Sequence, residues 1–223
     1  MLSDKNPEKI KKMFDEISSK YDLVNNVISF GTHKLIKYLA VRTLGVFPKA
    51  NVLDLCCGTG DFVRFINKIE PSSKVIGVDF SQEMIKLAKI NNPKGVFVQA
   101  DCTELPFGDG EFDFVTMGFG LRNIENRSQA IKQIVRVLAS GGKFLHVDFG
   151  YHNIFWSIFD FVISPLIRLL GKDYPHYEYL LKSKQEFPEP DELVKEFEYC
   201  GLRKVRIIKY FWGIISAQIM VKN

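Results

Sequence analysis

A short apolar strand that runs into a glycine turn is the feature that most constrains the fold of this chain. Residues 52–61 read VLDLCCGTGD, and the apolar residues that follow recur at helical spacing over 62–69. Gly58 and Gly60 give the backbone freedom to turn and leave space for a ligand close to the main chain. A strand, a glycine turn and a helix in this order are typical of the first unit of a nucleotide-binding α/β fold. The sequence therefore predicts a cofactor site at this turn.

The residues around the turn discriminate between cofactors. A dinucleotide fingerprint has a third glycine, and Val63 stands at that position here. Asp54 and Asp61 flank the turn, where they would repel a pyrophosphate but attract a ligand with positive charge. S-adenosylmethionine carries a sulfonium and an ammonium group. The charges therefore favour S-adenosylmethionine over a nicotinamide dinucleotide as the cofactor.

Two further predicted strands also end at acidic residues. The strand 74–79 ends at Asp79, about 20 residues beyond the glycines, which is the spacing at which a carboxylate accepts hydrogen bonds from ribose hydroxyls. The strand 95–100 is followed by Asp101 and Cys102. Helix capping is the alternative explanation for such carboxylates. Three consecutive strands with this pattern favour a cofactor site.

The order of predicted elements indicates an α/β fold. Helical patterns over 60–69, 82–91 and 128–139 alternate with strand patterns over 51–56, 74–79, 95–100, 112–117 and 143–149. A last helix over 191–200 precedes two strands, 202–211 and 213–222, whose short connection requires antiparallel pairing. We expect a Rossmann-like, seven-stranded, mostly parallel sheet with a C-terminal antiparallel hairpin and helices on both faces.

The length of 223 residues fits a single domain, 1–223, with internal divisions. Residues 1–45 are expected to form an N-terminal helical cap, in which Asn6 and Pro7 begin the first helix and Gly45 ends the second. Residues 46–150 and 191–223 form the cofactor-binding core. Residues 151–190 are expected to be a helical insertion that covers the substrate.

Composition excludes several classes of function. The net charge of +4 comes from scattered Lys and Arg rather than from a basic block, so nucleic acid is not an expected partner. The four cysteines fit no zinc pattern, and we expect no metal and reduced thiols. The N-terminus has no apolar signal core and no uncharged run is long enough to cross a bilayer, so a cytoplasmic location is predicted.

Several segments along the chain form a specific pattern: FDEI (14–17), KYDL (20–23) with Asn25, the turn at 52–61, LPF (105–107), GFGLRN (118–123), RVL (136–138) before Gly141 and Gly142, YEYLL (177–181) and GIISA (213–217). Together they resemble one family, the quinone-biosynthesis C-methyltransferases of the UbiE/MenG type within the class I methyltransferases. The GFGLRN and KYDL segments are the most specific. Gly118 replaces the serine of many members, and DFG (148–150) replaces Glu-Phe-Ser.

The resemblance implies methylation of a ring carbon on a polyprenylated hydroquinone in menaquinone or ubiquinone biosynthesis, with S-adenosylmethionine as methyl donor. The expected cofactor-binding residues are Asp54, Gly58, Thr59, Gly60, Asp79, Met84, Asp101, Cys102 and Gly118. For Met84, ordinary helix packing is the competing interpretation.

The chemistry identifies candidate catalytic residues. A ring carbon becomes nucleophilic when a neighbouring hydroxyl loses its proton, so the site must favour a phenolate. Arg122 follows the fourth strand and could hold the phenolate or orient a water, while Asn123 could bond a ring oxygen. Asp148, after the fifth strand, and Tyr21, in the first helix, are further candidates. His146 and His176 are expected to be structural and surface residues.

Residues 154–170 are far more apolar than a surface helix requires, although Asp160, Pro165 and Arg168 make them a poor membrane span. They either pack on the core or line a groove for a polyprenyl tail at a membrane interface. We expect peripheral association with the inner face of the membrane. The sequence leaves open whether the chain forms a homodimer.

Three other functions remain alternatives at this stage. A nicotinamide oxidoreductase would share the strand, turn and helix, but it conflicts with Val63 and the acidic residues. A non-catalytic scaffold conflicts with the intact set of acidic and glycine residues at the predicted site. A methyltransferase that acts on another small or lipidic acceptor is the strongest alternative, because acceptor pockets vary more freely than cofactor sites.

Overall fold

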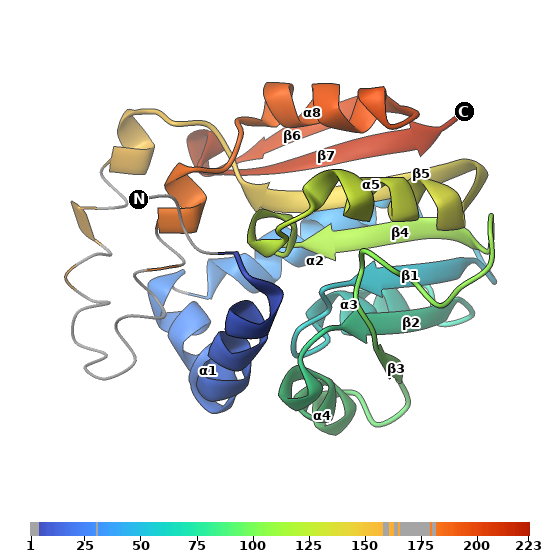
Figure 1. The fold of residues 1–223 in the computed structure, drawn as a ribbon, viewed down its shortest axis with the longest axis horizontal. Helices are drawn as coiled ribbons and strands as arrows, with labels where there is room; N and C mark the ends of the chain where they lie inside the picture. Colours follow the sequence, from blue (N-terminus) through green and yellow to red (C-terminus); the bar gives the residue numbers. More distant parts are fainter. Residues whose placement is uncertain (1–4, 30, 158–160, 163–164, 166–178, 180–181) are drawn as a thin grey trace.

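A seven-stranded sheet organises the part of the chain that the computed structural model describes, residues 5–29, 31–157, 161, 162, 165, 179 and 182–223 (Figure 1). Its strands are β1 (Asn51–Leu55), β2 (Lys74–Asp79), β3 (Val96–Gln99), β4 (Phe112–Gly118), β5 (Leu138–Phe149), β6 (Leu202–Tyr210) and β7 (Ile215–Lys222). The order is β3-β2-β1-β4-β5-β7-β6. Strands β1 to β5 pair in parallel, and β7 pairs antiparallel with both β5 and β6. The predicted sheet and hairpin are confirmed.

Helices cover both faces of this sheet. They are α2 (Thr32–Leu44), α3 (Asp61–Ile69), α4 (Gln82–Asn91), α5 (Arg127–Val137) and α8 (Pro190–Tyr199). Helices α5 and α8 pack with one buried cluster that includes Phe112, Phe144 and Phe197. Helices α2, α3 and α4 pack with a second cluster that includes Val63 and Phe114. The chain order reverses between β1 and β4, and in open α/β sheets a ligand binds at such a point.

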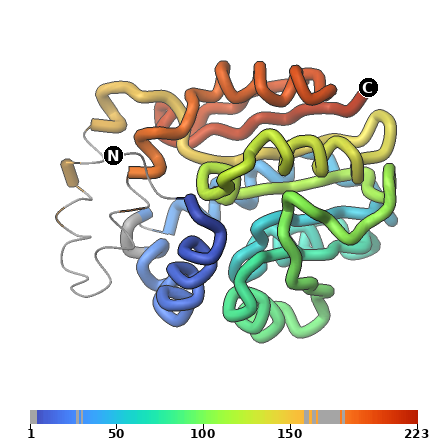
Figure 2. The backbone as a smooth tube through the Cα atoms, viewed as in Figure 1, coloured from blue at the N-terminus to red at the C-terminus, as the bar shows by residue number. Residues whose placement is uncertain are grey.

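The first helix, α1 (Pro7–Ile28), occupies a different place. In Figure 2 it lies at the edge of the sheet where the parallel strands end, rather than over either face. Asn6 caps it as predicted, because Asn6 Oδ1 accepts hydrogen bonds from the backbone N–H groups of Glu8 and Lys9. Gly45 ends α2 at φ 69°, also as predicted.

The largest departures from the predicted boundaries are at the start of β5 and at the C-terminal hairpin. Strand β5 begins at Leu138 and not at residue 143, because Leu138 pairs with Phe112 before the register shifts. Helix α5 therefore ends at Val137. At the hairpin, the short 3-10 turn η3 (Phe211–Gly213) separates β6 from β7. Regular spacing in the sequence carries no information about such register shifts.

Only part of the apolar segment 154–170 can be compared with its prediction. Residues 154–157, 161, 162 and 165 are helical, and the others lie outside the described residues, as do His176 and most of 177–181. In the described part of the chain, no helix is both long and apolar enough to cross a membrane.

Close packing explains why glycine rather than serine stands at residue 118, at the end of β4. A Cβ added to Gly118 would lie 2.2 Å from Cε2 of Phe62, a side chain that is 4% exposed. The ring of Phe62 thus fills the space that a side chain at residue 118 would need.

We expect Gly118→Ser to lower the free energy of unfolding by about 1–3 kcal/mol, because the added atoms overpack the core. Urea denaturation measures the loss. Phe62→Leu in the same chain should restore part of it by removing the ring edge. The control is Gly108→Ala, whose Cβ would meet nothing closer than 3.5 Å. Equal losses at both glycines would contradict this explanation.

Candidate functional site

A pocket of about 250 Å³ opens where β1, β2 and β4 end and α1 crosses the edge of the sheet. Eight of the predicted site residues line it: Tyr21, Gly58, Asp79, Met84, Asp101, Cys102, Gly118 and Asn123. Five others do not: Asp54, Thr59, Gly60, Arg122 and Asp148. The sequence argument assigned Tyr21 of α1 to the site but missed Ile10 and Phe14 of the same helix, which also line the pocket. Their helical spacing was visible, but the surface against which they pack was not.

Asp79 holds the glycine turn in shape. Its Oδ2 accepts a hydrogen bond from Gly58 N at 2.8 Å, and its Oδ1 accepts one from Ser81 N at 2.9 Å. Burial raises the pKa of this carboxyl, and the backbone donors oppose that effect. Each oxygen keeps further acceptor capacity for a ligand hydroxyl. Asp79 thus fixes two loops and also lines the pocket. The alternative interpretation, helix capping, is wrong for Asp79, because Ser81 is the N-cap residue of α4.

Two other pocket residues show the same double use. Asp101 Oδ1 accepts a hydrogen bond from Thr103 N at 2.8 Å. The side chain of Met84 is 1% exposed, so it packs in the protein as well as lining the pocket. Ordinary helix packing is therefore confirmed for Met84, and its contact with a cofactor stays a prediction.

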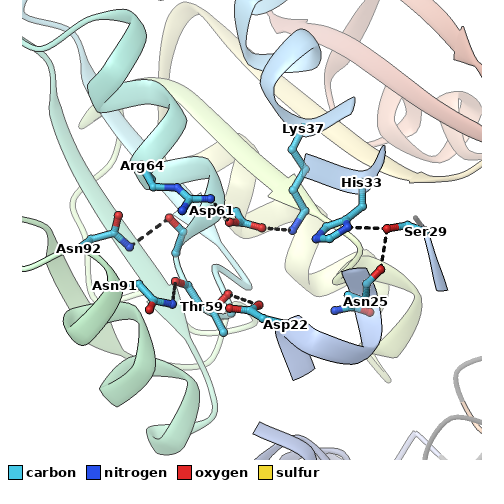
Figure 3. Close-up of polar contacts among 12 residues, drawn as sticks. Asp22, Asn25, Ser29, His33, Lys37, Thr59, Asp61, Arg64, Asn91 and Asn92 are labelled. Atoms are coloured by element: carbon cyan, nitrogen blue, oxygen red, sulfur yellow. Dashed lines mark hydrogen bonds and ion pairs between the residues drawn. The ribbon is translucent and has the colours of Figure 1, made fainter. Parts of the chain in front are cut away.

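The outer side of the glycine turn is bonded to neighbouring helices, as Figure 3 shows. Thr59 Oγ1 donates to Asp22 Oδ1 of α1 at 2.8 Å. The carbonyl groups of Thr59 and Gly60 accept from the side-chain amides of Asn91 and Asn92 at 3.2 and 3.3 Å. Thr59 and Gly60 therefore position the turn, and neither residue lines the pocket.

Helix α1 is fastened to the site at two points. Besides the bond between Asp22 and Thr59, Asp15 Oδ1 accepts a hydrogen bond from Ser81 Oγ. Ser81 is the N-cap residue of α4, and its hydroxyl also accepts from Met84 N. The wall that α1 supplies is thus tied to both the glycine turn and the start of α4.

The charge of Asp61 is compensated within the protein. Lys37 Nζ lies 2.9 Å from one carboxylate oxygen, and an Arg64 guanidinium nitrogen lies 2.7 Å from the other (Figure 3). The expectation that Asp61 attracts a cationic ligand is therefore wrong. Beside Lys37, His33 bonds Ser29 Oγ through Nδ1 at 2.6 Å, and burial with the nearby Lys37 lowers its pKa to about 4.

Asp54, in contrast, is a buried acid that can still accept a hydrogen bond. Its Oδ1 accepts from Thr116 Oγ1 at 2.7 Å, while its buried Oδ2 has no hydrogen-bond partner among the described residues. Burial raises the pKa of Asp54 to about 7. A positive charge nearby would stabilise the ionised form. This acid behind the glycine turn fits a cationic cofactor such as S-adenosylmethionine.

Arg122 and Asp148 form a buried ion pair behind the pocket wall. Arg122 Nη1 lies 3.0 Å from Asp148 Oδ1 and donates to the carbonyl of Phe119 at 2.6 Å. His146 is fully buried, as predicted, with Nε2 4.0 Å from Asp148 and Nδ1 2.6 Å from Gln218 Oε1. Burial lowers the pKa of His146, so its ring is neutral near pH 7. The pair fixes the turn that presents Asn123.

Asn123 and Tyr21 provide polar groups to the pocket itself. Asn123 Oδ1 is buried and has no hydrogen-bond partner among the described residues, although Nδ2 donates to Phe119 O at 3.4 Å. Burial raises the pKa of Tyr21, so its hydroxyl stays protonated near neutral pH. The pocket thus offers a hydrogen-bond acceptor and a donor to a bound molecule.

The pKa of Asp54 predicts a pH-dependent stability. The folded chain keeps a proton on Asp54 up to about pH 7, whereas the unfolded chain loses it near the usual value of 3.8. Its contribution to stability is therefore full below about pH 4 and is lost as the pH rises through 7. Asp54→Asn removes this titration. The free energy of unfolding of the variant relative to wild type should rise by roughly 2–4 kcal/mol from pH 4.5 to 8. An unchanged difference in urea unfolding would contradict the assignment.

The link between α1 and the glycine turn predicts a local effect. Asp22→Ala removes the acceptor of the Thr59 hydroxyl, worth about 1 kcal/mol. Amide hydrogen exchange in α1 should become roughly fivefold faster while exchange in β1 stays unchanged. Lys12→Ala, at a solvent-facing position of the same helix, is the matched control. Equal acceleration in both variants would mean that the bond does not hold α1.

Comparison with known proteins extends over nearly the whole chain. The demethylmenaquinone methyltransferase of Staphylococcus carnosus strain TM300 is 36% identical over 226 residues, which cover 97% of this chain and 94% of that protein. The protein of the same name from Staphylococcus aureus strain JH9 is 35% identical over 230 residues, which cover 98% and 95%.

Solved structures match the fold at low identity. A SAM-dependent methyltransferase from Thermotoga maritima, described as a possible histamine N-methyltransferase, has a TM-score of 0.69 at 19% identity and covers 96% of this chain and 100% of its own. A SAM-dependent methyltransferase from Aquifex aeolicus has a TM-score of 0.64 at 18% identity, with 98% and 99% covered. They confirm the class I methyltransferase fold.

The sequence family agrees with the structural neighbours. The ubiE/COQ5 methyltransferase family matches residues 2–222, which confirms the resemblance, the enzyme class and S-adenosylmethionine as the cofactor. This chain belongs to the ubiE/COQ5 methyltransferase family.

Proposed function

We propose that this enzyme methylates a ring carbon of a polyprenylated naphthoquinol, demethylmenaquinol, in menaquinone biosynthesis. The observation that carries the proposal is the match to two demethylmenaquinone methyltransferases over at least 97% of the chain. A benzoquinol of the ubiquinone pathway is a second acceptor within the same family. The pocket supports an aromatic, lipidic acceptor, because Ile10, Phe14, Phe119 and Ile124 contribute apolar walls.

For the cofactor, we propose that Asp79 and Asp101 hold its polar groups, with the backbone of Gly58 and Gly118 close to it. Met84 and Cys102 would pack against its apolar parts. Asp54 acts from behind the turn through its charge, while Thr59 and Gly60 act by fixing the turn. When bound, S-adenosylmethionine supplies an electrophilic methyl group.

For the acceptor, we propose that Asn123 Oδ1 accepts a hydrogen bond from a ring hydroxyl. Its unpartnered state in the pocket wall supports this role. Tyr21, which remains protonated, would donate to an oxygen that becomes negative as the ring loses its proton. Arg122 and Asp148 would act as positioning residues, because their charged groups bond each other and the Phe119 carbonyl.

The surroundings of the site suggest how a lipid-tailed molecule is handled. We propose that residues 151–190 form the insertion that covers the acceptor, next to the cap of residues 1–45. An acceptor with a polyprenyl tail resides in a bilayer, so the enzyme is expected to work as a peripheral protein at the cytoplasmic face of the membrane.

The proposal is tested with purified enzyme, S-adenosylmethionine carrying a deuterated methyl group, and a short-tailed demethylmenaquinol kept reduced. Mass spectrometry should find a product that has gained the labelled methyl on a ring carbon. Asn123→Ala should lower kcat by roughly 10- to 100-fold without weakening cofactor binding, because it removes a hydrogen bond to the acceptor. Asn67→Ala, the same substitution in α3 at a residue that does not line the pocket, is the control variant. The absence of any labelled quinol with the wild-type enzyme would refute the proposal.

A further inference from the structure

The turn between β6 and β7 exposes two large aromatic side chains in strained backbone positions. Phe211 is 42% and Trp212 is 71% exposed, and their φ angles are 46° and 54°. The left-handed region is unfavourable for most residues with a Cβ, and asparagine or glycine would fit there at lower cost. Exposed aromatic groups held under strain point to a function other than packing.

These side chains belong to a larger apolar surface, which we name the aromatic patch: Ile154, Phe155, Phe211 and Trp212. The rings of Phe155 and Trp212 stack with centroids 5.0 Å apart. Ile154 is 67% and Phe155 is 39% exposed. Asn153 Nδ2 donates to the carbonyl of Trp212 at 2.9 Å and so fixes the turn against this segment.

The aromatic patch is connected to the candidate active site by a row of rings. Phe119 in the pocket wall contacts Phe149 at 5.8 Å, and Phe149 contacts Trp156 at 5.5 Å between ring centroids. Trp156 is the chain neighbour of Phe155 in the aromatic patch. A surface bound at the aromatic patch would therefore lie at the outer end of an apolar path from the pocket.

The hairpin behind the aromatic patch is strongly basic. Residues 202–223 contain five Lys or Arg and no Asp or Glu. On the edge strand β6 the exposed cations are Arg203, Lys204, Arg206 and Lys209. No salt bridge involves them in the described part of the chain. Cations also protect an edge strand from pairing, but that role does not explain the exposed turn.

We propose that the C-terminal hairpin docks this enzyme on an anionic lipid bilayer, with the aromatic patch in the interface and the cations of β6 against the headgroups. The inference rests on the proposed function, since a membrane-resident acceptor requires such contact. Trp favours the membrane interface, and an anionic lipid surface attracts Lys and Arg side chains that lie close to it. Aromatic groups at one end of an edge strand that carries four exposed cations match this partner in both polarity and charge.

The experiment measures flotation of the full chain with vesicles of phosphatidylcholine, with and without 30% phosphatidylglycerol as a roughly physiological anionic content. Wild type should float with the anionic vesicles and less with neutral ones. Phe211→Asn with Trp212→Asn should reduce binding roughly fivefold or more, because asparagine suits the left-handed turn but removes the aromatic groups. Ile90→Asn, at a 71% exposed residue of α4, is the matched control and should float as wild type.

Charge is tested separately. Glutamate at Arg203, Lys204 and Arg206 should reduce binding to anionic vesicles roughly tenfold or more. Glutamate at Lys74, Lys89 and Lys94, which are exposed elsewhere, makes the same change in net charge and should have little effect. Equal losses in both triple variants would overturn the assignment of the docking surface, since they would reflect net charge alone.

Tryptophan fluorescence gives a direct readout. The chain has two tryptophans, and Trp156 is only 5% exposed, so Trp156→Phe leaves Trp212 as the single reporter. Its emission should shift to shorter wavelength with anionic vesicles and be quenched by brominated lipid. A wild-type chain that does not float, or a hairpin variant that floats fully, overturns the proposal. Methylation of a short-tailed quinol without vesicles reports on the proposed function independently.

Discussion

The site depends on the two backbone hydrogen bonds that the Asp79 carboxylate accepts. Its two oxygens bond the backbone of Gly58 in the first strand-to-helix connection and of Ser81 in the second. These bonds fix the positions of two adjacent loops relative to each other, and the pocket forms between the loops. A carboxylate held by backbone donors is also pre-organised, because it needs no rearrangement when a ligand arrives.

The fold was largely predictable because its signals are local. Strand and helix periods, the Asn6 cap and the short C-terminal connection each require information from a few neighbouring residues. The start of β5 was not predictable, since it depends on the pairing of Leu138 with Phe112, 26 residues earlier in the chain. The local sequence thus indicates where a strand lies in the chain better than it indicates the register in which that strand pairs.

The location of the candidate site was predictable from the sequence, but the roles of its individual residues were less so. The acids at the strand ends indicated where a ligand would lie. Their partners came from distant residues: Lys37 neutralises Asp61, and Arg122 pairs with Asp148. Sequence spacing does not encode such tertiary pairs. It also does not reveal that, among the acidic residues in the described part of the chain, Asp54 has a buried carboxylate oxygen without a hydrogen-bond partner. An acidic residue in a sequence motif is therefore not always available to a ligand, because another side chain of the protein can neutralise its charge.

Helix α1 contributes Phe14 and Tyr21 to the pocket and is bonded to the glycine turn through Asp22. Asp22 does not itself line the pocket, yet its bond holds a helix that does. A substitution at Asp22 can therefore change the shape of the pocket from a residue outside it.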